Sequence, residues 1–369
     1  MIRPPCAVVT HFVNFPTALL FTVPFALFSW STAHVLWTIL TGVCYFLACF
    51  LIWTVTAPRS PVLSALVIGF LLASSLTIFA GGNSVGFVVS LTTIAVWCFI
   101  RDRFGWAGVL CLAIALLFKP HDAALIWLFF FAAGGVYRRR ALQTLATAAV
   151  FFLVAAGWVS RVSPDWPHEQ QANLAIISAP GGMNDPAPGS AVDRTAGMVV
   201  DLQSIVAIFQ DAPVFYNLVT YILCGIPLLL WIRGVFHTSS SERSAWFALA
   251  AVIPLNMLIT YHKPYDLKLL LLAIPASFFL WNENNLRGQA AFLLTSGAVF
   301  FAAEVPLALF STFTEPLQPN LHSFTGKLLT ALFLRPVTLI LIALAAFYLT
   351  LYLRGSFPAA AAPSPSTSA

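Results

Sequence analysis

The sequence predicts an all-α polytopic membrane helix bundle with about ten to twelve transmembrane segments. Hydrophobic residues make up 60% of the chain and charged residues only 8%, whereas a water-soluble protein carries about 25% charged residues. The mean hydropathy is +0.89. Apolar stretches long enough to cross roughly 30 Å of hydrocarbon recur along the chain. They are continuous rather than alternating, which excludes a β-barrel.

The apolar stretches define the expected helices in chain order. They lie at residues 17–30, 33–55, 62–80, 84–100, 105–118, 122–136, 141–160, 213–233, 244–261, 266–282, 288–310 and 335–353. Pro16 directly precedes the first stretch and Pro24 lies inside it, and the stretch is short enough for a re-entrant segment. The stretches at 105–118 and 122–136 span the bilayer only if they lean on neighbouring helices.

The chain divides into one transmembrane domain, residues 1–355, and a tail, residues 356–369. The tail is rich in Ala, Pro and Ser, a low-complexity composition typical of disorder. A long outer loop covers about residues 161–212. Apolar residues recur at helical spacing within 198–209, which predicts an amphipathic helix lying in the membrane interface. Such a helix serves either as the wall of a lateral opening for lipid or as a plain lid.

The charged residues indicate which ends of the helices face the cytoplasm. When alternate loops are placed on opposite faces, one face receives ten arginines and three acids, whereas the other receives seven bases and ten acids. The positive-inside rule makes the arginine-rich face cytoplasmic. The long loop, the turn at 81–83, the turn at 119–122 and the turn at 261–266 then share the outer face. We therefore expect a multi-pass cell-membrane protein whose active face is periplasmic or extracellular.

Several classes of function are disfavoured by the sequence. The basic residues cluster at helix ends, as topology requires, and do not indicate nucleic-acid binding. The chain has no G-x-x-x-x-G-K-[ST] loop, no G-x-G-x-x-G and no H-E-x-x-H. It has no D-x-D pair and no zinc-type Cys or His spacing. We expect no cofactor and no metal, so an enzyme must take its activated substrate from the membrane.

The first polar motif is Lys119-Pro120-His121-Asp122, which interrupts two apolar stretches. Burying an ammonium and a carboxylate there is costly unless they are paired or meet water or a ligand. One interpretation is structural: Lys119 snorkels to the headgroups and Asp122 caps the next helix. The other is functional: Lys119 receives a phosphate, with His121 or Asp122 beside it.

The second polar motif is Tyr261-His262-Lys263-Pro264-Tyr265-Asp266, which opens an expected helix over 267–281. Asp266 stands where an N-cap belongs. Capping does not explain Tyr261, His262, Lys263 and Tyr265 together, and clustered polar residues in a membrane chain favour a functional site. The two motifs are expected to share a pocket on the outer face.

Two further residues are weaker candidates. Glu304 lies near the outer end of its helix, two residues before Pro306, and faces either a cavity with a partner base or the interface. Asn83, in the GGNS turn, is either a plain turn residue or part of the site.

The order of these motifs resembles that of a known family. The run IFAGGNSVGFVVSLTTIAVWCFIRDRFGWAGVLCLAIALLFKPHDAALIWLFFFAAGGVYRRRAL, residues 78–142, resembles the central block of the polytopic GT-C glycosyltransferases of family 87, long catalogued as the DUF2029 domain. Residues 14–37 resemble the family's Tyr-Pro-Pro segment, and residues 261–276 resemble a later Tyr/His/Asp turn before an apolar helix. The similarity covers about residues 12–285.

The resemblance implies transfer of a hexose, such as mannose, from a polyprenyl phosphate to an acceptor hydroxyl of a membrane lipid or glycan. Lys119 would then meet the donor phosphate, with Lys263 and His262 as further candidates, because a lysine ammonium suits a phosphate leaving group. A carboxylate should act as the general base.

One feature departs from the family pattern. Family members carry a first helix and an outer loop with the aspartate expected as base, but nothing acidic precedes Asp102 in this chain. The first helix and its loop are therefore expected to be missing, with Asp266 or Asp122 as substitute bases. The alternatives are a catalytically silent homologue, a transporter or flippase of lipid-linked sugars, and a polymerase or ligase of lipid-linked glycans.

Overall fold

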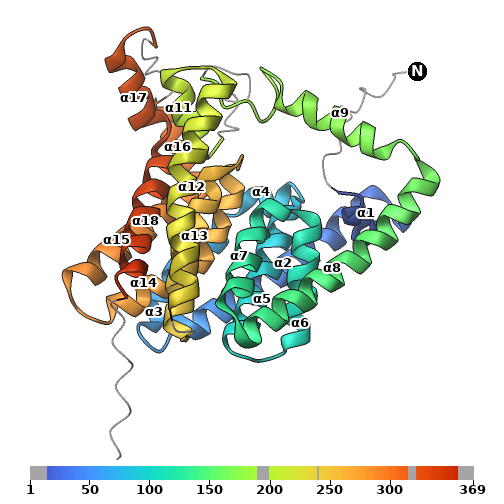
Figure 1. The fold of residues 1–369 in the computed structure, drawn as a ribbon, viewed down its shortest axis with the longest axis horizontal. Coiled ribbons are helices and arrows are strands. Elements are labelled where there is room, and N and C mark those ends of the chain that lie inside the picture. Colours follow the sequence, from blue (N-terminus) through green and yellow to red (C-terminus); the bar gives the residue numbers. More distant parts are fainter. Residues whose placement is uncertain (1–14, 189–198, 239–240, 315–320, 356–369) are drawn as a thin grey trace, which may run out of the picture.

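The computed structural model describes residues 15–188, 199–238, 241–314 and 321–355, and every regular element among them is a helix (Figure 1). The expected tail and the start of the expected helix over 198–209 fall outside these residues. In the first half the helices are α1 Thr17–Thr22, η1 Val23–Leu27, α2 Trp30–Thr56, α3 Pro61–Ala73, α4 Leu76–Ala80, α5 Ser84–Ile100, α6 Gly105–Phe118, α7 Pro120–Ala133, α8 Gly135–Val162 and α9 Trp166–Ser178. In the second half they are α11 Gln203–Phe209, α12 Pro213–His237, α13 Glu242–Ile259, η2 Pro264–Leu272, α14 Ile274–Trp281, α15 Leu286–Ala302, α16 Glu304–Thr314, α17 Phe324–Leu334 and α18 Pro336–Leu353.

The all-α polytopic class predicted from the sequence is confirmed. Five of the described helices are long and apolar enough to cross a membrane, or up to seven if each bent pair of helices forms one span. The sequence-based count of ten to twelve segments is larger because it includes apolar helices of 10–17 residues, such as α6 and α7. Large apolar side chains remain exposed along α8 and α12, for example Leu153 and Leu229, as expected for surfaces that face lipid.

Two helices form the centre of the bundle. Almost every side chain of α5 and of α13 is buried. Helix α5 packs against α2 and α6, whereas α13 packs against α18, α12 and α7. The short helix η2 contacts both α5 and α13. Helix η2 therefore links the two central helices, and the turn at 261–266 leads from α13 into it.

Four expected helices are interrupted, and prolines account for most of the breaks. The stretch at 17–30 divides into α1 and η1, with Pro24 in the first turn of η1. The stretch at 266–282 begins as the 3₁₀-helix η2 and bends by 46° into α14, which carries Pro275 in its first turn. Because proline has no N–H and crowds the preceding turn, it favours a new helix start over a helix interior. The stretch at 62–80 breaks between α3 and α4.

The fourth break separates α15 from α16 at Ala303, whose backbone is extended. Pro306 follows three residues later, and its ring cannot coexist with a continuing helix at Ala302. The carbonyl of Ala302 therefore lacks the usual donor from residue 306. The buried ammonium of Lys268 takes that place, with Nζ 2.7 Å from the Ala302 oxygen.

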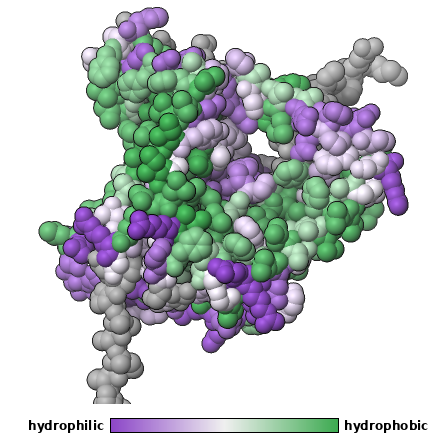
Figure 2. Space-filling model, in the orientation of Figure 1, coloured by the Kyte–Doolittle hydropathy of each residue, from purple (hydrophilic) through white to green (hydrophobic). Residues whose placement is uncertain are grey.

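The described part of the long outer loop contains the helices α9 and α11. Helix α8 continues to Val162, and α9 then runs along the upper edge of the molecule towards α11 (Figure 1). The surface is hollowed below α9, and hydrophilic residues gather on α9 and at the opposite end of the bundle, with apolar residues between them (Figure 2). The expected interfacial helix is shorter than predicted, because 199–202 is not helical and α11 begins at Gln203. Its apolar residues Val200, Leu202 and Val206 are buried in the bundle.

Candidate functional site

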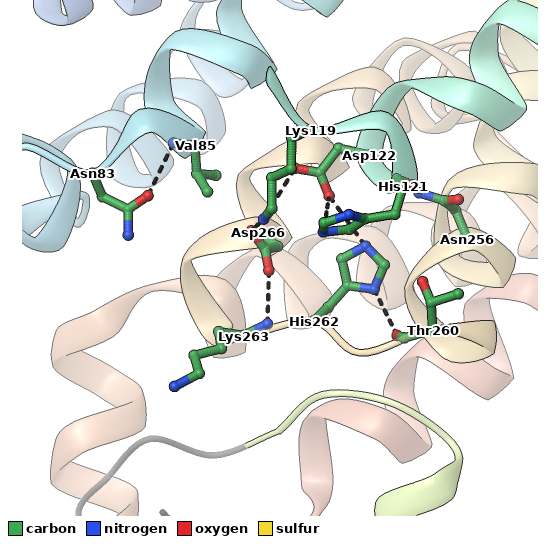
Figure 3. Close-up of polar contacts among 10 residues, drawn as sticks. All are labelled: Asn83, Val85, Lys119, His121, Asp122, Asn256, Thr260, His262, Lys263 and Asp266. Carbon is green, nitrogen blue, oxygen red and sulfur yellow. Dashed lines mark hydrogen bonds and ion pairs between the residues drawn. The ribbon is translucent and has the colours of Figure 1, made fainter. Parts of the chain in front are cut away.

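The two polar turns predicted from the sequence meet in the structure (Figure 3). Lys119 connects α6 to α7, and Pro120 begins α7 at the first helical position. The other turn connects α13 to η2, and Pro264 begins η2 in the same way. Proline suits the start of a helix because its missing N–H needs no partner there. Each proline therefore ends one apolar segment and places the neighbouring polar side chains at a helix junction.

Lys119 is held by two carboxylates from different turns. Its ammonium forms an ion pair with Asp266 Oδ1 and lies 3.2 Å from Asp122 Oδ2. The side chain of Lys119 is 15% exposed, whereas those of Asp122 and Asp266 are 1% exposed. Burial alone would lower the pKa of Lys119, but the adjacent carboxylates outweigh burial and raise that pKa above its ordinary value. Lys119 is therefore a charged, partly accessible ammonium.

Asp266 occupies a different position from the one expected. It was expected as the N-cap of a helix over 267–281, but it lies three residues after Lys263, which caps η2. Asp266 Oδ2 accepts a hydrogen bond of 2.7 Å from the backbone N–H of Lys263. The prediction of an N-cap was wrong because the two prolines flanking this segment start η2 earlier and α14 later. Both carboxylate oxygens of Asp266 have partners: Oδ2 accepts from the Lys263 N–H, and Oδ1 pairs with the Lys119 ammonium.

Asp122 faces two imidazole rings (Figure 3). Its Oδ1 lies 3.1 Å from Nε2 of His262 and 3.7 Å from Nε2 of His121. Nδ1 of His262 lies 2.8 Å from the Thr260 carbonyl oxygen. Burial opposes charge on His262, but the hydrogen bond to Asp122 raises its pKa above the ordinary value.

His121, Asp122 and His262 together form the only group of three ligating side chains, among the described residues, with geometry suited to a metal ion. Each offers one ligand atom, and these atoms all lie within 4.8 Å of one another. The sequence shows no metal motif here because His262 lies 140 residues from Asp122, beyond any local spacing pattern. Only the fold brings the three side chains together.

Four more predicted site residues border this cluster. The Tyr265 ring lies 5.6 Å from Lys119 Nζ, and its hydroxyl lies close enough to the Asn83 side chain to interact with it. Asn83 Oδ1 also accepts a 2.9 Å bond from the N–H of Val85, so this residue caps α5 as well as bordering the site. Lys263 turns its ammonium away from Asp266 (Figure 3) and places it 5.9 Å from the ring of Tyr261. Burial lowers the pKa of Lys263.

Glu304 lies in a separate group, the Lys268 cluster, made of Ser74, Thr77, Lys268, Ala302 and Glu304. Glu304 Oε2 accepts hydrogen bonds from the N–H and the hydroxyl of Thr77, at 2.7 and 2.9 Å. Lys268 is fully buried and donates to the carbonyls of Ala302, at 2.7 Å, and Ser74, at 3.3 Å. The sequence placed Lys268 on the outer face and did not single it out. Its position two residues after Asp266 in a 3₁₀-helix directs it away from Lys119.

Asp201 is a buried carboxylate that sequence analysis did not single out. Its Oδ1 accepts a 2.7 Å hydrogen bond from the N–H of Ser204, and the next residue back, Val200, donates its N–H to the His262 carbonyl at 2.7 Å. Burial raises the pKa of Asp201 to about 6. The spacing Asp-x-x-Ser at the start of an apolar run is a capping signal that identifies this role in retrospect.

Comparison with known proteins supplies the family. No curated protein and no solved structure matches the chain. The model of glycosyltransferase family 87 matches residues 12–261, which includes α1 to α13 and the Lys119 turn. The match ends at Tyr261, so His262, Lys263 and Asp266 lie just beyond it. Because the match covers more than half of the chain, this protein belongs to glycosyltransferase family 87.

Proposed function

We propose that this membrane glycosyltransferase moves a hexose, such as mannose, from a polyprenyl phosphate to a hydroxyl of a membrane lipid or glycan on the non-cytoplasmic face. The observation that carries the proposal is Lys119, one partly accessible ammonium shared by two buried carboxylates. A lysine is a compact point charge that suits a phosphate. The charges of the cluster provide both groups that sugar transfer needs, a cation for the leaving group and a carboxylate for the attacking hydroxyl.

In the proposed reaction the bond between the anomeric carbon and the phosphate oxygen breaks, and a bond from the acceptor oxygen to the same carbon forms. The phosphate leaves with the electron pair of the broken bond, and Lys119 stabilises the resulting negative charge. The acceptor hydroxyl gives its proton to a carboxylate acting as general base.

The arrangement of Lys119 suggests how that base becomes available. With no donor bound, Lys119 occupies Asp266 Oδ1, and a carboxylate paired with an ammonium is a weak base. A donor phosphate competes for the same ammonium and releases Oδ1, while Oδ2 stays fixed by the Lys263 N–H. We therefore assign Asp266 as the first candidate for the base. Asp122 is the second, because His262 also occupies it.

The remaining predicted residues would surround the substrate. Tyr265 and Asn83 lie on the α5 side of Lys119, while Tyr261 and Lys263 lie on the α13 side. Tyrosine hydroxyls and amides suit sugar hydroxyls, and Lys263 offers a second cation for phosphate. His121 and His262 border Asp122.

Charge at the far ends of the helices supports the proposed face. Helix α7 runs from the site to the turn before Arg138, and α13 runs from Glu242 to the site. At that opposite end Arg101 pairs with Glu242 at 3.2 Å, and Arg243 pairs with Glu283. An arginine-rich end is cytoplasmic by the positive-inside rule, which would place the Lys119 cluster outside.

The test is a transfer assay with the purified full chain in lipid nanodiscs. Radiolabelled polyprenyl-phosphate mannose and a second polyprenyl-phosphate hexose are supplied with a membrane-lipid extract as acceptor. We expect label to move from the donor to a new lipid or glycan product. Transfer from a nucleotide sugar but from neither polyprenyl donor would contradict the proposal.

A transporter or flippase of lipid-linked sugars is the second candidate, supported by the interrupted helices. Transporter sites use discontinuous helices with ionisable residues near their breaks. Lys268 lies in η2, which bends by 46° into α14, and Glu304 follows the break after α15. Movement of a fluorescent polyprenyl-phosphate sugar between leaflets of proteoliposomes, without transfer, would favour this candidate. Donor binding with neither transfer nor movement would indicate a catalytically silent homologue.

A further inference from the structure

We propose that His121, Asp122 and His262 bind a divalent transition-metal ion, for which Zn²⁺ is the test ion. Each of the three residues offers one ligand atom, and these atoms all lie within 4.8 Å of one another. Nε2 of His121 and Nε2 of His262 both face Oδ1 of Asp122. Two imidazoles and one carboxylate are a donor set that binds zinc and related first-row metals. Three protein ligands leave a coordination position for water or a substrate oxygen.

The distances from Asp122 to the two imidazoles fit a common centre. Metal bonds of about 2.1 Å in tetrahedral geometry separate neighbouring ligand atoms by about 3.4 Å. The distances from Asp122 Oδ1 to the two Nε2 atoms are 3.1 and 3.7 Å, on either side of that value. The other oxygen of Asp122 points to Lys119 at 3.2 Å. Asp122 would therefore bind the ion through one oxygen and keep its ion pair through the other.

The hydrogen bond of His262 fixes the orientation that a ligand needs. Nδ1 lies 2.8 Å from the Thr260 carbonyl, an acceptor only, so Nδ1 carries a proton. In the neutral ring Nε2 then presents its lone pair to Asp122, as in metal sites where the second ring nitrogen donates to a backbone carbonyl. A hydrogen bond of 2.8 Å from Asn256 Nδ2 to the His121 carbonyl holds the other ligand's backbone in place.

The position of His121 favours a bound metal ion over a proton on His262 as the group shared by the three side chains. A proton on Nε2 of His262 satisfies the contact with Asp122, but it leaves His121 Nε2, a buried atom with no hydrogen-bond partner, unsatisfied. The 3.7 Å from His121 to Asp122 is too long for a hydrogen bond. An ion between the three atoms satisfies both rings.

The charges of the cluster favour an added cation. With neutral imidazoles, Lys119 contributes one positive charge and Asp122 and Asp266 contribute two negative charges, which leaves a net charge of −1 in a buried volume. The ammonium of Lys263 does not neutralise it, since this side chain points away from Asp266 (Figure 3). A bound divalent ion would change this net charge from −1 to +1, and the two carboxylates would offset two of the three positive charges then present.

The experiment measures metal binding directly and requires no sugar transfer, so its failure is separate from failure of the proposed function. The purified full chain is treated with a chelator, dialysed and titrated with Zn²⁺ by calorimetry. Co²⁺ is then added to a second sample, and its visible absorption reports nitrogen and oxygen ligation. We expect one tight equivalent, and Co²⁺ bands that Zn²⁺ abolishes.

The decisive variant is His121→Ala, because this side chain is 36% exposed and its loss should leave the fold intact. We expect its Zn²⁺ affinity to fall at least tenfold to a hundredfold, since even outer-sphere changes have effects of about that size. His262→Gln should give a similar loss. His168→Ala, on the exposed surface of α9, is the matched control and should bind as the unmodified chain does.

Either of two results would overturn the proposal. One is the absence of stoichiometric Zn²⁺ binding to a folded chain. The other is equal affinity in the unmodified chain and in His121→Ala, which would assign any bound ion to other residues. In both cases a proton on His262, and no metal, would account for the contact with Asp122.

Discussion

Lys268 is part of the short helix η2, and Lys119 forms an ion pair with Asp266 of the same helix. The surroundings of the two lysines nevertheless differ. Lys119 is bound by two carboxylates and keeps 15% of its side chain exposed. Lys268 is fully buried and is bound by two backbone carbonyls, at the ends of α3 and α15. A ligand anion can exchange with a carboxylate, whereas a helix-end carbonyl has no ready substitute for its donor. The charge of Lys119 is therefore available for binding a ligand, whereas the charge of Lys268 holds the ends of two helices together.

The same distinction applies to the carboxylates. Asp122 and Asp266 both bind the Lys119 ammonium, although Asp266 also accepts the N–H of Lys263. The hydrogen bonds of Asp201 and Glu304 come instead from Ser204 and Thr77. We therefore expect changes in the Lys119 cluster to affect transfer, and changes in the other residues to affect stability.

The largest expected effect comes from Lys119→Ala. Removing the group that stabilises the leaving phosphate should lower the rate of transfer by about 10²- to 10³-fold. Initial rates with the polyprenyl-phosphate donor measure the effect. Lys327→Ala removes the same charge from a lysine that donates to the Phe209 carbonyl, far from the Lys119 cluster in the chain, and it should keep its rate. Equal rates for the two variants would remove Lys119 from the reaction.

Asp201→Asn should change how stability depends on pH. Burial raises the pKa of Asp201 to about 6 in the folded chain, above its value of about 4 in the unfolded chain. The folded state binds this proton more tightly than the unfolded state does. The contribution of Asp201 to the free energy of unfolding therefore falls as the pH rises from about 4 to 6, by up to roughly 3 kcal/mol. Asparagine keeps the oxygen that caps Ser204. Thermal unfolding at pH 4 and pH 7 should show that the variant gains stability relative to the unmodified chain only at the higher pH.

Lys268→Met should destabilise the fold without the specific loss expected for Lys119. Methionine fills similar volume but leaves the carbonyls of Ala302 and Ser74 without this donor, at a cost of about 1–3 kcal/mol each. Relief of a buried charge offsets part of that cost, so we expect a net loss of about 2 kcal/mol. Thermal unfolding in detergent measures it. A variant of unchanged stability that has lost transfer would place Lys268 in the reaction and favour the transporter candidate.

Glu304→Gln should have the smallest effect. The amide oxygen still accepts from the N–H and hydroxyl of Thr77, so stability should fall by less than about 1 kcal/mol. Glu304→Ala removes the acceptor and should cost about 1–2 kcal/mol. If Glu304 binds substrate, as the sequence suggested, the glutamine variant would instead lose transfer while its melting temperature stays close to that of the unmodified chain.

The sequence predicted the fold class because continuous apolar stretches leave few alternatives in a membrane. It located most helices but missed several breaks. Pro275 and Pro306 indicate possible interruptions, yet prolines also occur inside unbroken helices here, as Pro227 and Pro254 do in α12 and α13. A break is stabilised when another group donates to the carbonyl that has lost its helical partner. After α15 that donor is Lys268, which reaches the Ala302 carbonyl only in the folded chain.

The two motifs of the site were predictable because clustered polar residues are rare in this chain. Their meeting was expected from topology, and the ion pair between Lys119 and Asp266 confirms that the turns lie together. The pairing of His262 with Asp122 was not predictable, since topology brings the two turns together but does not determine which side chains face one another. Glu304 was grouped with the site from its residue type and lies elsewhere, because the break after α15 directs it to Thr77.

The most direct measurement of the central claim is binding of unlabelled polyprenyl phosphate, which carries the recognised anion but no sugar. Affinity is measured for the unmodified chain, for Lys119→Met and for Lys268→Met in nanodiscs. We expect the Lys119 variant to bind at least tenfold more weakly and the Lys268 variant, where folded, to bind as the unmodified chain does. Equal binding by the Lys119 variant and the unmodified chain would contradict the assignment of this lysine to the donor phosphate.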